Sequence, residues 1–303
     1  MQTALERRLS DVKRAVRGIG YSDGQYVSLD EISVSILDFG FIHSDATYDV
    51  CRIREGRAFL FDRHLDRFYK SSEKMRLEVP VSRDEIKRIA AELWRRSDFE
   101  VGFLWMCLTR GIPESGNPRD LATCRPRFMM YIKPYYSFGS NPSVSVCVAE
   151  SVKRSGPETI DPRWKNFAWV DLTKAQWEAR DRGFDTAILV DQRGYVSEGP
   201  GFNIGLVKNS RVMAPKGNAL YGVTMQAVEA ASNRLGLLFE YGDLVVGDFL
   251  SADEVFVTST AGGVTPVHRF NQRIFIQGVQ TQRLIDEYWS MHQLGEFSQP
   301  LIL

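Results

Sequence analysis

A short segment between Pro134 and Pro142 divides this chain of 303 residues into two halves that each mix strands with helices. Its proline, glycine, asparagine and serine residues are typical of a connection between domains. We therefore expect an α+β fold with two domains. The expected boundaries are a small N-terminal domain over residues 1–134, a linker over residues 135–142, and a large C-terminal domain over residues 143–303.

The spacing of apolar residues predicts the elements of both halves. An N-terminal helix is expected over residues 4–17, a helix capped by Asp62 follows later, and another helix covers residues 82–96. Strands are expected at residues 34–37, 47–53, 103–108 and 128–132. In the second half, helices are expected over residues 172–182 and 225–235, with strands at 187–190, 202–207 and 254–258. Residues 111–124 are rich in Gly, Pro and polar residues, which is typical of a long loop that serves as a functional lid.

The composition excludes several classes of function. A formal net charge of zero argues against a nucleic-acid binder. The longest apolar runs are too short to span a membrane, and the first 18 residues lack the apolar core of a secretory signal. The four cysteines are widely spaced and form no CxxC pair, so we expect no metal site, no disulfide scaffold and a location in the cytoplasm.

One lysine and one glutamate stand out by their surroundings. Lys165 lies in the sequence Trp164-Lys165-Asn166-Phe167, before an aromatic run that ends at Trp169. A lysine beside aromatic rings is partly desolvated, and its unprotonated amine can then form an imine. Glu198 precedes Gly199-Pro200-Gly201, and small residues of this kind let a planar ligand approach the backbone closely. From residue type alone, each is more often an ordinary surface or turn charge.

Two segments offer donors for an anion such as a phosphate. Gly222, Val223 and Thr224 come directly before an amphipathic helix, and a helix N-terminus that carries glycine and a hydroxyl is an anion site. A plain helix cap would look the same. The segment Ser259-Thr260-Ala261-Gly262-Gly263 follows a strand and offers a second set of hydroxyl and amide groups.

Taken in order, these segments resemble the fold-type IV aminotransferases, which depend on pyridoxal 5'-phosphate (PLP). The resemblance runs from about Tyr26 to about Tyr288. It implies that Lys165 holds the PLP aldehyde as a Schiff base and moves the substrate proton, that Glu198 pairs with the pyridine nitrogen, and that Arg67 binds the phosphate. It further implies cofactor contacts from Phe202, Asn203, Val223, Thr224, Ser259 and Thr260. A homodimer with an active site at the subunit boundary is also implied.

The run His43-Ser44-Asp45-Ala46-Thr47-Tyr48 is similar to the (R)-selective amine transaminases within this family. By that resemblance His43 and Tyr48 contact substrate, as does Ala261. Branched-chain aminotransferases place a tyrosine and an arginine where this chain has Phe103 and Trp105. An indole cannot make the bidentate bond of a guanidinium to a carboxylate.

D-amino-acid transaminases carry an Arg-x-His pair in the loop that follows, and this chain has Arg119-Asp120-Leu121. Arg119 is therefore the expected carboxylate ligand for a keto acid, whereas Arg110, at a strand end, is expected to be structural.

The resulting hypothesis is a PLP-dependent transaminase that moves an amino group from a primary amine, of (R) configuration, to a small keto acid such as pyruvate. A D-amino-acid transaminase and a branched-chain aminotransferase are the first alternatives, and an elimination enzyme like aminodeoxychorismate lyase is a weaker one. The alternative that is not an enzyme is a non-catalytic descendant of the fold. Against this alternative stands the presence of four residues, Lys165, Glu198, Arg67 and Thr224.

Overall fold

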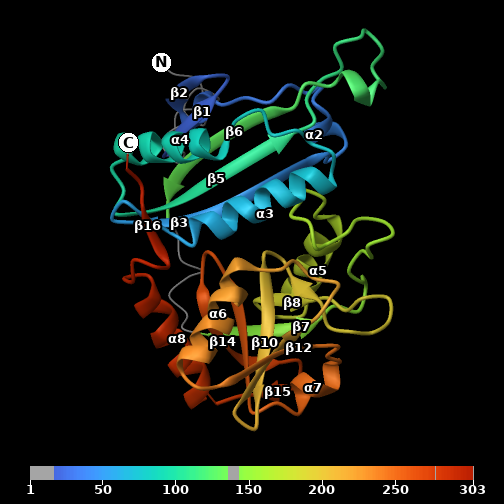
Figure 1. Ribbon diagram of the computed structural model, residues 1–303. Coiled ribbons are helices and arrows are strands. Elements are labelled where there is room, and N and C mark those ends of the chain that lie inside the picture. The colour runs from blue at the N-terminus through green and yellow to red at the C-terminus, as the bar shows by residue number, and fades with distance from the viewer. Residues whose placement is uncertain (1–16, 136–142, 277, 303) are drawn as a thin grey trace, which may run out of the picture. The chain divides into compact units, whose positions relative to one another are not determined.

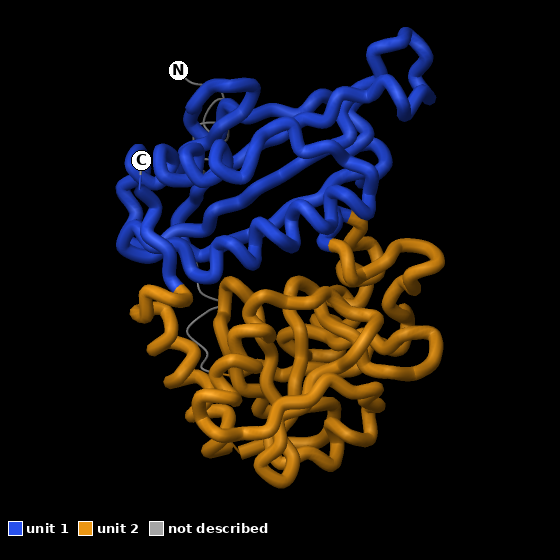
Figure 2. Tube along the Cα trace, in the orientation of Figure 1, with its two compact units in different colours: residues 1–135, 165–167, 298–303 blue, residues 136–164, 168–297 orange. Residues whose placement is uncertain are grey.

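The computed structural model describes residues 17–135, 143–276 and 278–302. Two compact units make up the chain, and Figure 2 colours them separately. Unit 1 contains Met1–Tyr135, Lys165–Phe167 and Ser298–Leu303, and unit 2 contains Tyr136–Trp164 and Ala168–Phe297. The two short segments that belong to unit 1 had no signal in the sequence. The expected N-terminal helix, apart from Arg17, and the expected linker, apart from Tyr135, lie outside the described residues.

Unit 1 is built on an antiparallel sheet that has seven strands within its described residues. The strands lie in the order β16-β4-β3-β5-β6-β1-β2 (Figure 1). Their bounds are β1 Ile19–Ser22, β2 Gln25–Ser28, β3 Ala46–Arg54, β4 Arg57–Phe59, β5 Val101–Thr109, β6 Arg127–Pro134 and β16 Ser298–Pro300. The helices are α2 Phe39–Ile42, α3 Phe61–Lys74 and α4 Arg83–Arg96, with 3-10 turns η1 Leu29–Glu31 and η2 Leu121–Thr123.

The core of unit 1 lies between one face of this sheet and the helices α3 and α4. Leu65 and Phe68 of α3 and Ile89 of α4 pack against Leu104 and Met130 of the sheet, and all five are fully buried or nearly so. Because neighbouring residues of a strand face opposite sides, Trp105 and Tyr131 point to the other face, away from this core. That second face is the one that carries the predicted substrate residues of the sheet.

Helix termini in unit 1 follow local chemistry. The Ser82 side chain accepts a hydrogen bond from the Glu85 backbone N–H at 3.2 Å and caps α4 as predicted. Asp62 does not cap α3, because Leu60 takes the N-cap position in a left-handed conformation with φ of 52° and Asp62 falls in the first turn. There its negative charge still complements the helix dipole.

The predicted strand at residues 34–37 is wrong. These residues form irregular backbone and a turn, in which Ile36 and Leu37 are 73% and 61% exposed. The turn is fixed by the buried carboxylate of Asp38, which accepts hydrogen bonds from the Gly40 N–H at 2.7 Å and the Thr109 hydroxyl at 2.7 Å. These bonds direct the chain into α2 and not into a sheet ladder.

Unit 2 contains a mixed sheet with nine strands among its described residues. Seven strands lie in the order β12-β11-β10-β13-β14-β7-β8, while β15 pairs with β14 and β9 with β10. The bounds are β7 Val144–Val148, β8 Thr186–Ile188, β9 Glu198–Gly199, β10 Phe202–Lys208, β11 Arg211–Pro215, β12 Leu238–Gly242, β13 Glu254–Ser259, β14 Gly263–Phe270 and β15 Arg273–Ile274. The helices are α5 Val170–Asp181, α6 Val223–Arg234, α7 Val246–Leu250 and α8 Val279–Met291. The expected α+β class is confirmed.

Two of the buried clusters in the described part of unit 2 involve α7 and α5. One contains Ile204, Val255 and Phe270 of the sheet with Phe249 of α7. The other joins Leu172, Ala175 and Ala179 of α5 to Ala187 and Leu189. Helix α5 ends where predicted, at Gly183, whose φ of 72° an L-residue with a side chain adopts only with strain. No helix among the described residues is long and apolar enough to cross a bilayer.

Replacing Ile89 by alanine is expected to lower the free energy of unfolding by about 2–5 kcal/mol, since it opens a cavity in the core of unit 1. Arg88→Ala on the same helix removes only an exposed ion pair to Glu85 and is expected to cost less than about 1 kcal/mol. Urea unfolding followed by circular dichroism measures both. Equal shifts of the unfolding midpoint would contradict the assignment of this helix face to the core.

Candidate active site

The backbone of Lys165 is clamped between β3 and α3 in unit 1. The Thr47 hydroxyl donates a hydrogen bond to the Lys165 carbonyl at 2.6 Å, and the Lys165 N–H donates to the Ser71 hydroxyl at 3.0 Å. The Phe167 N–H donates to the Ala46 carbonyl at 3.2 Å, and Asn166 forms a β-bridge with Thr47. The lysine side chain therefore extends from a fixed main chain and not from a mobile loop.

The ring beside Lys165 in unit 1 is Tyr48. The Lys165 Nζ lies 4.4 Å from the centroid of the Tyr48 ring, and the Phe167 ring lies 4.6 Å from the same ring. The sequence had predicted aromatic surroundings from the neighbouring residues of the chain, and a residue far away in sequence supplies the main contact. A cation over a ring face is attracted by its quadrupole, so this contact holds the amine in place.

Tyr48 begins a row of stacked rings on the second face of the unit 1 sheet, the face that points away from the core of that unit. The centroids of Tyr48 and Trp105 are 5.2 Å apart with an interplanar angle of 13°, and those of Trp105 and Tyr131 are 5.6 Å apart at 10°. Strand register explains the row. Tyr131 of β6 pairs with Trp105 of β5, and so does Val50 of β3, which lies two residues after Tyr48 and on the same face of the sheet. Phe103, two residues before Trp105, lies on the same face. Three predicted substrate residues are thus brought together with Tyr131, which the sequence gave no reason to select.

The predicted phosphate ligand Arg67 makes a bidentate ion pair. Its Nε and Nη2 donate to the two carboxylate oxygens of Asp49 at 2.7 and 2.8 Å, and Asp49 is fully buried. The pair fixes the orientation of the guanidinium while using only part of its five N–H donors. Although burial raises the pKa of Asp49, the charge of Arg67 and the hydrogen bonds from Arg67 and His64 lower it overall, so the carboxylate is ionised.

His64 completes this cluster as a neutral group. Burial lowers its pKa most strongly, and the neighbouring Arg67 and Lys165 lower it further against the opposing effect of Asp49. Its Nδ1 lies 2.7 Å from an Asp49 carboxylate oxygen, which requires the Nδ1–H tautomer as donor. Asp49 and His64 were not predicted, since only the pairing of β3 with α3 brings them to Arg67.

His43 and Arg119 lie apart from the aromatic row. His43 ends the short helix α2 and is exposed, with its ring against Phe39 at 4.8 Å. Arg119 is exposed on the loop over residues 111–124, which Figure 1 shows projecting from the sheet of unit 1. Their substrate roles stay predictions. Arg110 is structural, because its side chain binds Asp45 at 2.7 Å and the backbone carbonyls of Met75 and Arg76.

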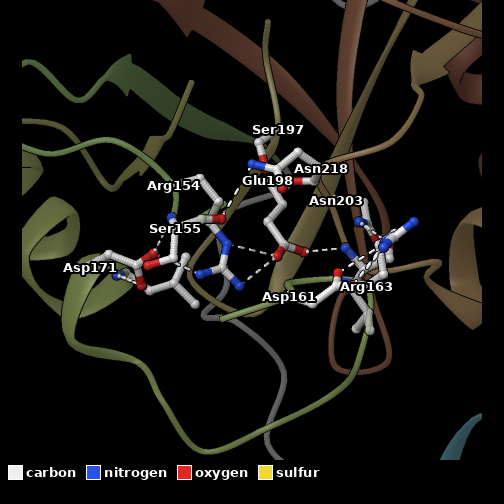
Figure 3. Close-up of polar contacts among 11 residues, drawn as sticks. Arg154, Ser155, Asp161, Arg163, Asp171, Ser197, Glu198, Asn203 and Asn218 are labelled. Atoms are coloured by element: carbon white, nitrogen blue, oxygen red, sulfur yellow. Dashed lines mark hydrogen bonds and ion pairs between the residues drawn. The ribbon is translucent and has the colours of Figure 1, made fainter. Parts of the chain in front are cut away.

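In unit 2, Glu198 is a buried carboxylate held by two segments (Figure 3). The Arg154 Nε donates to its Oε1 at 3.0 Å and the Leu220 N–H donates to its Oε2 at 3.1 Å. Arg154 also donates to Asp171 at 2.7 Å. Glu198 sits on the two-residue strand β9 opposite Asn203 of β10. Arg154 and Asp171 are further residues that sequence reasoning missed.

Two positions near Glu198 require glycine for steric reasons. A side chain at Gly199 would collide with the Phe202 ring, and one at Gly222 would collide with the Asn203 side chain. The Asn203 amide donates to the Leu220 carbonyl at 2.8 Å. Phe202 and Asn203 therefore pack tightly on the turns that lead to Glu198 and to α6.

The N-terminus of α6 has the composition of an anion site. Its N-cap is Gly222, which provides no side-chain cap, and Val223 and Thr224 of the first turn are buried. The unpaired N–H groups of such a turn attract negative charge. The other predicted donor set, Ser259 to Ala261, forms the turn between β13 and β14, where the Ser259 hydroxyl accepts a hydrogen bond from the Gly262 N–H at 2.8 Å.

Comparison with known proteins identifies the family. Residues 46–270, which include every segment of the site except His43, match the profile of the family described as amino-transferase class IV. The chain belongs to the class IV aminotransferases. It is therefore a PLP-dependent aminotransferase, as its resemblance to fold-type IV enzymes implied.

This class IV aminotransferase has relatives with different substrates in their names. It is 26% identical over 257 residues to a Methanocaldococcus jannaschii protein assigned as a branched-chain-amino-acid aminotransferase, covering 84% of this chain and 88% of that one. It is 27% identical over 258 residues to a D-alanine aminotransferase of Listeria monocytogenes, covering 80% and 83%. Its fold is similar to the crystal structure of a branched-chain aminotransferase from Thermoproteus uzoniensis with norvaline. That likeness has a TM-score of 0.87 at 22% identity and covers 94% of this chain and 99% of that one.

The residue types of each unit suit a group of PLP. In unit 1, the backbone of Lys165 is fixed, and its amine suits an aldehyde. In unit 2, the buried carboxylate of Glu198 suits a protonated ring nitrogen, and the first turn of α6 suits a phosphate. When bound, PLP supplies an electron-withdrawing ring that stabilises negative charge on the substrate carbon.

Replacing Asp49 by asparagine is expected to lower the stability of the aminotransferase by about 3 kcal/mol at pH 7, because it removes the buried carboxylate that pairs with Arg67. The pKa of Asp49 is lower in the folded protein than in the unfolded chain. Its ion pairs therefore contribute stability above about pH 4, and this contribution is lost as the pH falls further. The difference between wild type and variant should shrink accordingly in urea unfolding curves recorded from pH 7 to pH 3.

Asp66→Asn on α3, the helix that carries Arg67, is the matched control. Asp66 forms an exposed ion pair with Arg83, so its loss should cost less than about 1 kcal/mol at any pH in this range. A loss in Asp49→Asn that does not vary with pH would contradict the ion-pair account.

Proposed function

We propose that this aminotransferase moves an amino group from a primary amine, of (R) configuration, to a small keto acid such as pyruvate. The observation that carries the proposal is the aromatic face of the unit 1 sheet. Phe103 and Trp105 stand where branched-chain enzymes are expected to carry a tyrosine and an arginine, and Trp105 stacks on Tyr48. A row of ring faces favours an apolar substituent over a carboxylate. The (R) preference rests on the resemblance of the run from His43 to Tyr48.

Each proposed cofactor residue acts through a group already described. Lys165 holds the aldehyde and moves the proton at its Nζ, and Glu198 pairs with the ring nitrogen. Arg67, the α6 turn at Val223 and Thr224, and the hydroxyls of Ser259 and Thr260 bind the phosphate. Phe202 and Asn203 shape the surface for the ring.

The substrate residues divide by chemistry. Tyr48, Phe103 and Trp105 contact the apolar group of the amine, and His43 and Ala261 line the same substrate. Arg119, which is exposed on its loop, receives the carboxylate of the keto acid. A single arginine on a loop can bind the carboxylate of the keto acid in one half-reaction. In the other half-reaction it can move away, so that the site accepts the apolar group of the amine.

A specific observation supports an amino-acid substrate as the second candidate. The Lys133 Nζ lies 5.2 Å from the centroid of the Trp105 ring, on the same sheet face. An ammonium there can pair with a substrate carboxylate in place of the missing arginine. The relative named as a D-alanine aminotransferase agrees with this reading.

We further propose a homodimer. Ile36, Leu37 and Phe41 of unit 1 are 73%, 61% and 66% exposed, and several large apolar side chains exposed close together in sequence favour an interface. Light scattering of the purified protein measures the mass directly. The cytoplasmic location stays an expectation from composition.

Adding (R)-1-phenylethylamine without a keto acid should bleach the visible band of the bound cofactor, because the amine needs no carboxylate partner on the aromatic face. The rate should exceed that with D-alanine by at least about tenfold, which corresponds to about 1.4 kcal/mol in activation free energy. Stopped-flow absorbance measures both rates, and (S)-1-phenylethylamine is the control for configuration. A large excess for D-alanine would overturn the amine proposal and favour the reading based on Lys133.

Replacing Lys165 by alanine should abolish transamination with every donor, because no other amine is proposed to hold the aldehyde. Reduction with borohydride followed by peptide mass spectrometry should place PLP on Lys165 in the wild type and nowhere in the variant. Lys174→Ala, a nearby exposed lysine that donates to the Ser151 carbonyl, is the control and should keep full activity. Full activity in Lys165→Ala would refute the assignment.

A further inference from the structure

Glu198 is one end of a buried row of three charged side chains in unit 2. Arg154 stands in the middle, and its Nη1 lies 2.7 Å from Asp171 and its Nη2 lies 2.9 Å from Glu198 (Figure 3). The side chains of Asp171, Arg154 and Glu198 are only 10%, 5% and 8% exposed. They come from three separate segments, namely the first turn of α5, the chain after β7, and strand β9.

The row contains two carboxylates and one guanidinium group. Burial lowers the pKa of Arg154, but the charges of Glu198 and Asp171 raise it overall. Burial raises the pKa of Asp171, but the Ser155 N–H and Arg154 lower it overall. With Glu198 ionised, the sum of charges is minus one.

A buried net charge is costly unless a cation lies against it. Asp171 is bound by Arg154, on the side toward Glu198, and by the backbone N–H groups of Ser155 and Leu172. At the other end, the Leu220 N–H donates to the Glu198 Oε2. Because Arg154 lies between the two carboxylates, the charges of Arg154 and Asp171 both act on Glu198.

We propose that Arg154 and Asp171 are positioning residues that set how strongly Glu198 holds a proton on the PLP ring nitrogen. Arg154 fixes the carboxylate, and Asp171 balances the charge of Arg154 so that Glu198 keeps its full negative charge. This inference rests on the proposed role of Glu198. It assigns a function to two residues that need not touch the cofactor.

The two residues should act in opposite directions. Asp171→Asn keeps the size and an acceptor oxygen but makes the row neutral, so the ring nitrogen should lose its proton at a lower pH. Arg154→Gln makes the row more negative, so the ring nitrogen should hold its proton to a higher pH. We expect each shift to be about one pH unit, a tenfold change in proton affinity. A merely structural role would move both variants in the same direction.

The test uses holoenzyme loaded with PLP that carries nitrogen-15 in the ring. The nitrogen-15 chemical shift reports protonation of that atom and is followed from pH 5 to pH 10, with circular dichroism to confirm folding. Asp171→Glu restores the charge and should titrate like the wild type. Asp191→Asn is the matched control, because Asp191 is a buried acid of unit 2 that caps a turn and pairs only with the exposed Arg193 among the described residues.

Opposite shifts in Asp171→Asn and Arg154→Gln, with none in Asp191→Asn, would support the proposal. If one variant fails to fold, the sign of the other decides. An unchanged titration or a shift of the wrong sign in a folded variant would overturn it. Failure of the proposed function is distinct, because it appears as a wild type that binds no PLP or as activity that survives Lys165→Ala.

Discussion

The hydrogen bonds between strand β3 and the segment from Lys165 to Phe167 are the contacts on which the candidate site depends. Thr47 binds the Lys165 carbonyl through its hydroxyl and bridges Asn166, and Ala46 accepts from the Phe167 N–H. Through these bonds a short piece from the second half of the chain becomes part of unit 1. Tyr48, the next residue of β3, then has its ring beside the Lys165 amine. One strand thus fixes both the proposed cofactor lysine and the ring that adjoins it.

Each unit also encloses a small group of charges that is arranged around one acid. In unit 1 the acid is Asp49, which aligns Arg67 and His64. In unit 2 it is Glu198, which Arg154 holds in place. Replacing a whole buried ion pair by hydrophobic residues of similar volume often leaves a protein equally stable, although removing one partner alone is costly. The presence of these buried charges beside the candidate cofactor residues fits a role in directing charge.

The sequence predicted local features well and contacts between distant segments poorly. Helix α4 was predicted because Ser82 caps it and its apolar residues recur at helical spacing. Lys165, Glu198 and the α6 turn could be predicted as site residues because their motifs are contiguous in sequence. Arg154 and Asp171 were missed because their ion pairs join residues 44 and 17 positions apart. Tyr131 was missed because only the register of β5 with β6 places it on Trp105.

The last strand of the chain has a consequence for biosynthesis. Strand β16 pairs with β4 across residues Ser298 to Pro300, so the sheet that starts at the N-terminus receives its edge strand last. A ribosome releases the chain from its N-terminus onward, and domains generally fold in that order. Unit 1 can form only part of its structure during translation, and β4 exposes an unpaired edge until β16 emerges. An edge of this kind is open to pairing with other chains, so pairing with β16 protects β4 from aggregation.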